Sequence, residues 1–318
     1  MERYFGSENV TRPFRNSAIA LGNFDGVHLG HKYIISKTIE LAKKTGGVSV
    51  VYTFDPHPVK ILAPESCPLL IQTISQRLAA LEDLKVDVSI VENFTHEFAA
   101  QTPEQFFEQI LIKRLGAKAI VVGYDFTFGY HRGGTIEVLE ELGKRHNVEV
   151  LVVEAKFVGD LLLSSTEIRH FVSTGNVEEA EQMLGRPFRI EGKVVAGKGL
   201  GAYLGAHTAN IEPENELLPG NGVYLSLTYV FERRATSDER RCWPSITSIG
   251  HNPTFPGGPF SVETHLIGFE GKLLGEIIAV DFLKKMRDQI AFPSVEKLHG
   301  QIIKDVEEAR IWHENRTL

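Results

Sequence analysis

The feature that most constrains the fold is an alternation of strand-like and helix-like segments, which stops near residue 186. Segments such as 31–47 and 135–146 carry apolar residues at helical spacing. Between them lie short runs rich in β-branched residues, at 17–22 (SAIALG), 48–54 (VSVVYTF), 118–123 (KAIVVG) and 148–154 (VEVLVVE). This alternation predicts a parallel sheet with helices on its faces.

The pattern changes after LGRPF at 184–188. From there, short strand-like runs are separated by Gly, Pro and Asn, and the next helix-length segment is 294–312. Such a pattern predicts a small antiparallel barrel that ends in a helix. We therefore expect an α/β plus β chain with domains at 1–186 and 187–318.

Composition narrows the class of protein. The 318 residues carry a net charge of −7, which gives no electrostatic case for nucleic acid or an anionic membrane as a partner. Cys67 and Cys242 are the two cysteines, and their separation argues against a disulfide scaffold or a structural zinc site. No apolar run approaches the roughly 18 residues of a membrane helix. We expect a cytoplasmic protein, whose oligomeric state the sequence does not indicate.

The segment GNFDGVHLGH, residues 22–31, follows the first predicted strand and leads into the first predicted helix. Ligands of parallel sheets bind at this edge, where helix N-termini offer N–H groups suited to phosphate. His28 and His31 can donate hydrogen bonds to phosphoryl oxygens. Taken alone, the two histidines are also compatible with a metal pair or with a plain turn.

This segment resembles the HxGH signature of the nucleotidylyltransferase superfamily, in the variant of prokaryotic bifunctional riboflavin kinase/FMN adenylyltransferases, or FAD synthetases. TFDPHP (53–58), GYDFTFGYHRGG (123–134) and SSTEIR (164–169) resemble further segments of that family, in the same order. The resemblance implies that residues 1–186 form a Rossmann-like nucleotidylyltransferase domain. It also implies that residues 187–318 form a riboflavin kinase domain built on the small barrel.

For the first domain, the resemblance implies attack of the FMN phosphate on the α-phosphorus of ATP, with release of pyrophosphate. His28 and His31 would be catalytic. The residues expected to bind ATP and its phosphates are Gly22, Asn23, Phe24, Gly30, Ser164, Ser165, Thr166 and Arg169. Those expected to bind FMN are Asp55, His57 and Asp125. Without the resemblance, SSTEIR reads equally as a helix cap, and the FMN set as turn or strand-end residues.

In the second domain, GKVVAGKGLGAYLGAHTAN (192–210) resembles the riboflavin kinase motif that usually ends in GFPTAN. The resemblance implies that Gly197, Gly199, Gly201, Thr208 and Asn210 bind ATP, with Thr208 and Asn210 also binding Mg²⁺. Ala206 and His207 stand where the family has Phe and Pro. Glycine-rich strings also serve ordinary β-turns.

A second match to the kinase, SIGHNPTFPGGPFSVETHLIGF (248–269), resembles NxGxRPTF followed by VExHxxDF. Glu263 falls on the family's catalytic glutamate, the general base for the 5′-hydroxyl of riboflavin. An exposed glutamate on a strand is the alternative reading. Ser248, Asn252 and Gly268 depart from the family's Asn, Arg and Asp.

Close to the C-terminus, Arg287 and Asp288 fall on the family's RDE-like loop, which reads RDQ here and lies near the flavin in the family. For Arg287, the alternative is a surface cation beside Lys284 and Lys285.

The expected function is FAD biosynthesis with ATP and Mg²⁺: phosphorylation of riboflavin to FMN, then adenylylation of FMN to FAD. One alternative keeps the adenylyltransferase and makes the barrel a degraded flavin-binding domain. Others are a non-catalytic flavin-binding regulator, and adenylyl transfer to a different nucleotide. The expected partners are small molecules, without nucleic acid or membrane.

Overall fold

A computed structural model describes residues 1–196, 208–231, 241–251, 253–254, 257 and 259–316. The chain forms two compact units, Met1–Ser165 and Thr166–Leu318. Helix α7 (Ser165–Thr174) therefore begins at the end of the first unit, and α8 (Val177–Leu184) lies in the second. The division of the two functional domains at residue 186 stays a prediction.

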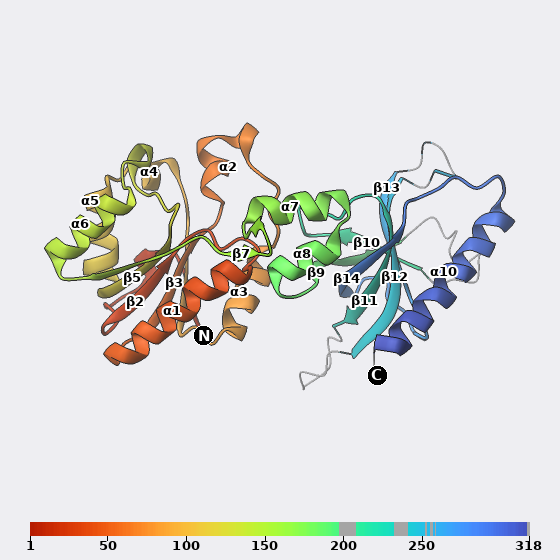
Figure 1. Cartoon of the computed structure of the whole chain (residues 1–318), viewed down its shortest axis with the longest axis horizontal. Coiled ribbons are helices and arrows are strands. Elements are labelled where there is room, and N and C mark those ends of the chain that lie inside the picture. Colours follow the sequence, from red (N-terminus) through yellow and green to blue (C-terminus); the bar gives the residue numbers. More distant parts are fainter. Residues whose placement is uncertain (197–207, 232–240, 252, 255–256, 258, 317–318) are drawn as a thin grey trace. The chain divides into compact units, whose positions relative to one another are not determined.

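The first unit is built on a six-stranded parallel sheet with the order β1-β4-β3-β2-β5-β6 (Figure 1). The predicted parallel sheet is thus confirmed. Its strands are β1 (Glu2–Phe5), β2 (Ser17–Leu21), β3 (Ser49–Phe54), β4 (Val88–Glu92), β5 (Ala117–Gly123) and β6 (Glu149–Val153). The chain runs outward from β2 through β3 and β4, then crosses back to β5 on the other side of β2. In sheets of this kind, ligands bind beyond the carboxyl ends of the strands at such a reversal, which here are β2 and β5.

Helices cover both faces of this sheet. On one face, α1 (Leu29–Thr45) and α3 (Ile74–Asp83) pack against Ala20, Val51 and Val121. On the other, α6 (Ile136–His146) and the π-helical segment Phe106–Arg114 pack against Ile19, Val50 and Ile120. Shorter helices are α2 (Pro58–Leu62), α4 (His96–Ala99) and α5 (Pro103–Gln105), and single 3₁₀ turns are Ser7–Asn9, Pro64–Ser66 and Tyr130–Arg132.

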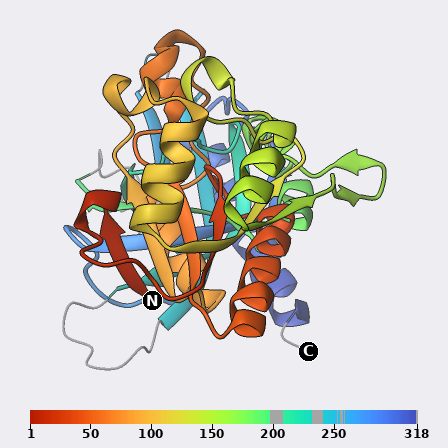
Figure 2. The same cartoon turned by 90° about the vertical axis from the view of Figure 1, so that its left-hand side faces the viewer.

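Local signals in the sequence set the helix ends. Gly46 ends α1 in the left-handed conformation, with φ 60°. Thr102 and Gln105 form a reciprocal capping box at α5, the pattern that Thr-Pro-Glu-Gln favours at a helix start. A two-stranded hairpin, β7 (Phe157–Val158) with β8 (Leu161–Leu162), projects from the first unit in Figure 2.

The second unit is a closed barrel with the strand order β10-β13-β12-β11-β14-β9, and all its pairs are antiparallel. The predicted barrel and its terminal helix are confirmed. The elements are β9 (Phe188–Val195), β10 (Thr208–Pro213), β11 (Gly222–Val230), β12 (Arg241–His251), β13 (Phe260–Leu266), β14 (Ile277–Arg287) and α10 (Val295–Arg316). Helix α10 packs outside the barrel, where Ala309 meets Val223, Leu225 and Ile246.

The barrel interior holds a closed ring of five hydrogen-bonded hydroxyls. Going round the ring, the members are Thr247, Thr264, Thr228, Ser245 and Ser226, with Oγ–Oγ distances of 2.8–3.2 Å. All five side chains are fully buried. Because each hydroxyl has one hydrogen to donate, five bonds among five hydroxyls satisfy every donor. The ring joins β11, β12 and β13 and so supports their register.

Among the residues that the structure describes, no helix is long and apolar enough to cross a membrane.

Candidate active sites

The loop after β2 is tightly folded and buried. Phe24 and Val27 both have left-handed backbone conformations, with φ 48° and 39°, although neither is glycine. Gly26 between them has φ 86°. A β-branched residue in this region is strained, and such strain persists only where the surroundings impose it. Phe24 and Val27 are indeed buried in the core below the loop.

Asp25 anchors this loop from below, a role that its place in the motif does not predict. Its carboxylate is 1% exposed and accepts hydrogen bonds from the backbone N–H groups of Ile71 and Gln72, at 3.0–3.1 Å. Its backbone carbonyl accepts from the hydroxyl of Ser165 at 3.0 Å. One residue therefore ties GNFDGVHLGH both to the segment before α3 and to the start of α7.

His28 and His31 lie against each other at the start of α1. His28 is the N-cap, and its Nδ1 accepts from the backbone N–H of His31. The two rings are stacked with centroids 3.6 Å apart, and Phe24 meets the ring of His31 edge-on. A Cβ at Gly30 would lie 3.1 Å from the ring of His28 and 3.4 Å from Leu163. The glycine thus leaves room for the imidazole.

Asn23 and His57 form a second part of this site. The side-chain amide of Asn23 lies 3.1 Å from Nε2 of His57, so the loops after β2 and β3 meet there. His57 also caps α2, because its Nδ1 accepts from the backbone N–H of Val59. The hydroxyl of Thr53 donates to the carbonyl oxygen of Asn23 at 2.8 Å and fixes the backbone at that residue.

A buried arginine that the sequence did not single out supports these loops. Arg77, on α3, is 2% exposed and donates from Nη1 to Thr53 Oγ1 and to the carbonyl oxygen of Phe54. Burial lowers its pKa, and the charges of Asp25 and Asp55 oppose that shift. From the sequence, Arg77 reads as one more polar residue on an amphipathic helix.

The other predicted adenylyltransferase residues are placed as follows. Asp55 directly follows β3 and Asp125 lies two residues after β5, and both are exposed at the carboxyl edge of the sheet. Ser164 directly precedes α7, whereas Thr166 and Arg169 lie on α7 within the second unit. The first unit therefore brings together Gly22, Asn23, Phe24, His28, Gly30, His31, His57 and Ser165 through the contacts above.

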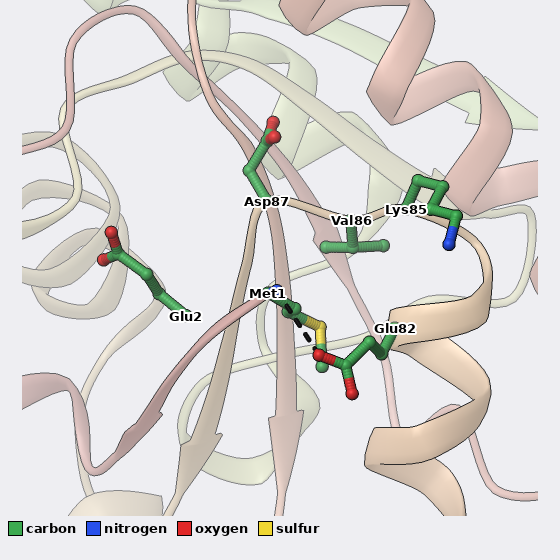
Figure 3. A pocket seen from close by; sticks show the side chains of 6 residues that line it. All are labelled: Met1, Glu2, Glu82, Lys85, Val86 and Asp87. Carbon is green, nitrogen blue, oxygen red and sulfur yellow. Dashed lines mark hydrogen bonds and ion pairs between the residues drawn. The ribbon is translucent and has the colours of Figure 1, made fainter. Parts of the chain in front are cut away.

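A surface hollow of about 600 Å³ lies elsewhere on the first unit and contains none of the predicted residues. It is lined by Met1, Glu2, Glu82, Lys85, Val86 and Asp87 (Figure 3). Glu2 begins β1, and Asp87 directly precedes β4, so the hollow is at the amino ends of the strands. Ligands of parallel sheets bind at the opposite edge.

On the barrel, the strand register aligns three of the kinase residues. Asn210 on β10 pairs with Glu263 on β13, and Glu263 pairs in turn with Ser248 on β12. Opposed residues of antiparallel strands point to the same face, so these side chains form one row. Their neighbours Thr264 and Thr247 belong to the interior ring, and the row therefore lies on the outer face. Thr208, two residues before Asn210, shares that face.

Several kinase predictions lie outside the described residues. They are Gly197, Gly199 and Gly201 of the glycine-rich segment, the departures Ala206 and His207, and Asn252. Gly268 is described, and its φ of 75° places it in a left-handed turn after β13. Glycine suits that conformation better than the Asp of the family pattern.

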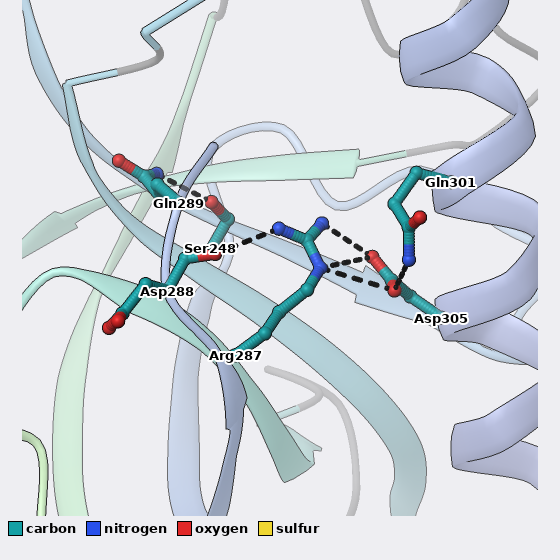
Figure 4. A network of polar contacts seen from close by, with 6 residues as sticks. All are labelled: Ser248, Arg287, Asp288, Gln289, Gln301 and Asp305. Carbon is teal, nitrogen blue, oxygen red and sulfur yellow. Dashed lines mark hydrogen bonds and ion pairs between the residues drawn. The ribbon is translucent and has the colours of Figure 1, made fainter. Parts of the chain in front are cut away.

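Arg287 is engaged with α10. Its Nε and Nη2 donate to the carboxylate of Asp305, the shortest distance being 2.6 Å, and Nη1 donates to the carbonyl oxygen of Asp288 (Figure 4). Gln301 donates to Asp305 as well. Asp288 is exposed and bonded to Lys285 at 2.7 Å, and this bond lowers its pKa. Arg287 is thus an anchor of the loop rather than a free surface cation.

In the described ranges, no group of three or more His, Cys, Asp or Glu side chains is arranged to hold a metal ion. The donors on the outer barrel face are the hydroxyl of Thr208, the amide of Asn210 and the carboxylate of Glu263. Oxygen donors of this kind suit Mg²⁺, which commonly keeps several waters and substrate phosphates as its remaining ligands. The residues present therefore fit a magnesium–nucleotide complex.

Doubly wound sheets commonly bind nucleotides at the point where the strand order reverses, and here the loop that carries His28 and His31 follows the strand at that point. Residues 11–167 match the family model for FAD synthetase, and residues 184–313 match that for riboflavin kinase. Together with the relatives described next, these matches show that the chain belongs to the bifunctional riboflavin kinase/FMN adenylyltransferase family.

Relatives with that name match over nearly the whole chain. The protein of Buchnera aphidicola subsp. Schizaphis graminum is 34% identical, over 95% of this chain and 96% of its own. That of Haemophilus influenzae is 33% identical, over 98% of both chains, and that of Escherichia coli is 31% identical, over 96% of both. A crystal structure described as a macrolide-efflux protein from Streptococcus pneumoniae is 30% identical, has a TM-score of 0.84, and covers 98% of this chain and 99% of its own.

Proposed function

We propose that this protein makes FAD from riboflavin in two ATP-dependent steps. The barrel unit phosphorylates riboflavin to FMN with release of ADP. The first unit transfers the adenylyl group of a second ATP to FMN and releases pyrophosphate. The observation that carries this proposal is the presence of both family domains on one chain that matches its relatives over nearly their full length.

In the adenylyl step, a phosphate oxygen of FMN attacks the α-phosphorus of ATP, and the bond to the β-phosphate oxygen breaks. The reaction needs no covalent enzyme intermediate, so catalysis consists of positioning and charge stabilisation. We assign His28 and His31 to the phosphates of ATP, because both imidazoles lie at the N-terminus of α1. The helix dipole there also favours an anion.

The placement of the other candidate residues supports their assignment to ATP or FMN. Asn23 and His57 meet at the carboxyl ends of β2 and β3, and Asp55 and Asp125 lie at the same edge of the sheet. We assign Asp55, His57 and Asp125 to FMN. The ATP phosphates are assigned to two groups of residues: Gly22, Asn23, Phe24 and Gly30 of the loop, and Ser164, Ser165, Thr166 and Arg169 around the start of α7.

In the kinase step, Glu263 takes the proton of the riboflavin 5′-hydroxyl as that oxygen attacks the γ-phosphorus of ATP. Asn210, its cross-strand neighbour, and Thr208 are assigned to the magnesium–nucleotide complex. Mg²⁺ would supply charge neutralisation at the phosphates. A chain that keeps Thr208, Asn210 and Glu263 retains the groups that this step needs, which favours a working kinase over a degraded flavin-binding barrel.

We also propose a cytoplasmic location. Cys67 and Cys242 are both free thiols, as is usual in a reducing compartment.

The test is a pair of incubations of the purified protein with ATP and Mg²⁺, one with riboflavin and one with FMN, followed by chromatography of the flavins. We expect FMN and FAD from riboflavin, FAD from FMN, and neither product when EDTA is added. If FAD formed from FMN but no FMN formed from riboflavin, the protein would be an adenylyltransferase without kinase activity. No product in either incubation would indicate a non-catalytic flavin-binding protein.

A further inference from the structure

The side-chain amide of Gln289 lies across strand β12. Its Nε2 donates to the hydroxyl of Ser248 at 2.9 Å, and the two side chains point toward each other in Figure 4. A Cβ at Gly250 would lie 2.5 Å from Oε1 of Gln289. The glycine in the SIG segment therefore leaves the space in which this amide lies.

Gln289 is the middle of three anchors of the loop 287–292. Before it, Arg287 is held by Asp305 of α10. After it, the backbone N–H of Phe292 donates to the hydroxyl of Thr254 at 3.2 Å. Gln289 ties the loop to the strand that pairs with Glu263.

Both members of this pair depart from the family pattern quoted above, which has Asn in place of Ser248 and Glu in place of Gln289. The two departures are 41 residues apart in sequence and in direct contact. Here the amide is on the loop and donates to a hydroxyl on the strand. A neutral amide therefore stands where the family pattern has a carboxylate.

We propose that Ser248 and Gln289 form a coupled positioning pair of the kinase site, in which one hydrogen bond holds the loop 287–292 against β12 and sets the affinity for riboflavin. This inference rests on the proposed kinase function. The 5′-hydroxyl of riboflavin must reach Glu263, so the flavin has to lie against the outer face of the barrel. Ser248 is the neighbour of Glu263 on that face, and the loop borders it.

A double-mutant cycle with near-isosteric changes isolates the hydrogen bond. The variants are Ser248→Ala, Gln289→Met and the double variant, in the full-length chain. We expect each single change to raise the KM for riboflavin about fivefold, with kcat within about twofold, since one net hydrogen bond is lost. The double variant should also show about a fivefold rise, because the same bond is lost only once.

Three further measurements make the result specific. Ser248→Thr keeps the hydroxyl and should bind riboflavin within about twofold of wild type. Gln182→Met changes an exposed glutamine on α8 in the same way and should change nothing. Formation of FAD from FMN should be equal in all variants, which a general loss of folding would not allow.

If the KM for riboflavin rose about 25-fold in the double variant, the two single effects would be independent and the pairing would be wrong. Single variants with an unchanged KM would also overturn the proposal. Binding is measured in parallel by the quenching of riboflavin fluorescence. If wild type binds riboflavin without making FMN, the kinase function fails and the pairing is judged from the Kd values of the same four proteins. If wild type does not bind riboflavin, both proposals fail.

Discussion

The hydroxyl of Ser165 donates a hydrogen bond to the backbone carbonyl of Asp25 across 140 positions of sequence. This contact joins two segments that the sequence picks out independently, GNFDGVHLGH and SSTEIR. The carboxylate of Asp25 meanwhile binds the backbone of Ile71 and Gln72. The loop that presents His28 is thus held from two sides, as a site that depends on exact positioning requires.

Replacing Asp25 by Ala should release this loop. The N–H groups of Ile71 and Gln72 would stay buried without their acceptor, at a cost of about 3 kcal/mol in the free energy of unfolding. We expect FAD formation from FMN to fall at least tenfold, while FMN formation from riboflavin is unchanged. Circular dichroism during thermal unfolding and the two flavin assays measure this. Asp83→Ala, an exposed position on α3, is the matched control; wild-type FAD formation in the Asp25 variant would refute the anchoring role.

Replacing Gly30 by Ala tests the space beside His28. The added Cβ would lie 3.1 Å from the imidazole and would push the ring away from its place. Small displacements of catalytic groups are costly, so we expect FAD formation to fall by about tenfold or more. Gly300→Ala on α10, where a Cβ meets nothing within 4 Å, is the control and should leave both activities unchanged. An active Gly30 variant would mean that the position of the His28 ring is not important.

The hydroxyl ring of the barrel predicts that replacing Thr228 by Val lowers the free energy of unfolding more than replacing it by Ser. Thr228→Val keeps the shape of the side chain but leaves a buried hydroxyl partner unsatisfied, which should cost about 1–3 kcal/mol. Thr228→Ser loses a methyl group and keeps the ring, so its cost should be smaller. Trp243 and Trp312 are the two tryptophans and both lie in the second unit, so their fluorescence follows this unit during urea unfolding. A valine variant as stable as the serine variant would contradict the ring.

Asp305→Ala should destabilise the second unit, because it leaves Arg287 without its carboxylate. Asp305 is buried, and removing one partner of a buried pair costs about 3 kcal/mol. Asp288→Ala on the same loop should have little effect, since that side chain is exposed and its bond to Lys285 is open to water. Tryptophan fluorescence in urea compares the two. If both variants lost the same free energy of unfolding, the loop rather than the buried pair would determine the stability.

Most of the fold follows from local patterns. The strands at 17–21 and 117–123, the left-handed cap at Gly46 and the capping box at Thr102 were all predictable, because each depends on residues close in sequence. Five strands were not predicted, namely the two strands of the β7–β8 hairpin and three that pair with distant strands. β1 and β4 are short, and β10 follows a glycine-rich segment that does not read as a strand. In these three cases, pairing with distant strands supplies the stabilisation that the local sequence lacks.

The candidate sites likewise contain residues that local motifs predict and residues that only contacts between distant segments reveal. His28, His31 and Ser165 were predicted from motifs, whereas Asp25, Arg77 and Gln289 were not. Asp25 acts on residues 46 and 47 positions away, and Gln289 contacts a strand 41 positions back. Such contacts leave no periodic signal in the sequence. The departure at Ser248 was visible, but its partner became clear only from the hydrogen bond.

The most direct test of two separate sites compares His28→Ala with Glu263→Ala in both flavin assays. We predict that His28→Ala abolishes FAD formation from FMN and still converts riboflavin to FMN. Glu263→Ala should do the reverse, because the two side chains belong to different units. If His28→Ala stopped both reactions in a protein with normal circular dichroism and tryptophan fluorescence, the assignment of one reaction to each unit would be wrong.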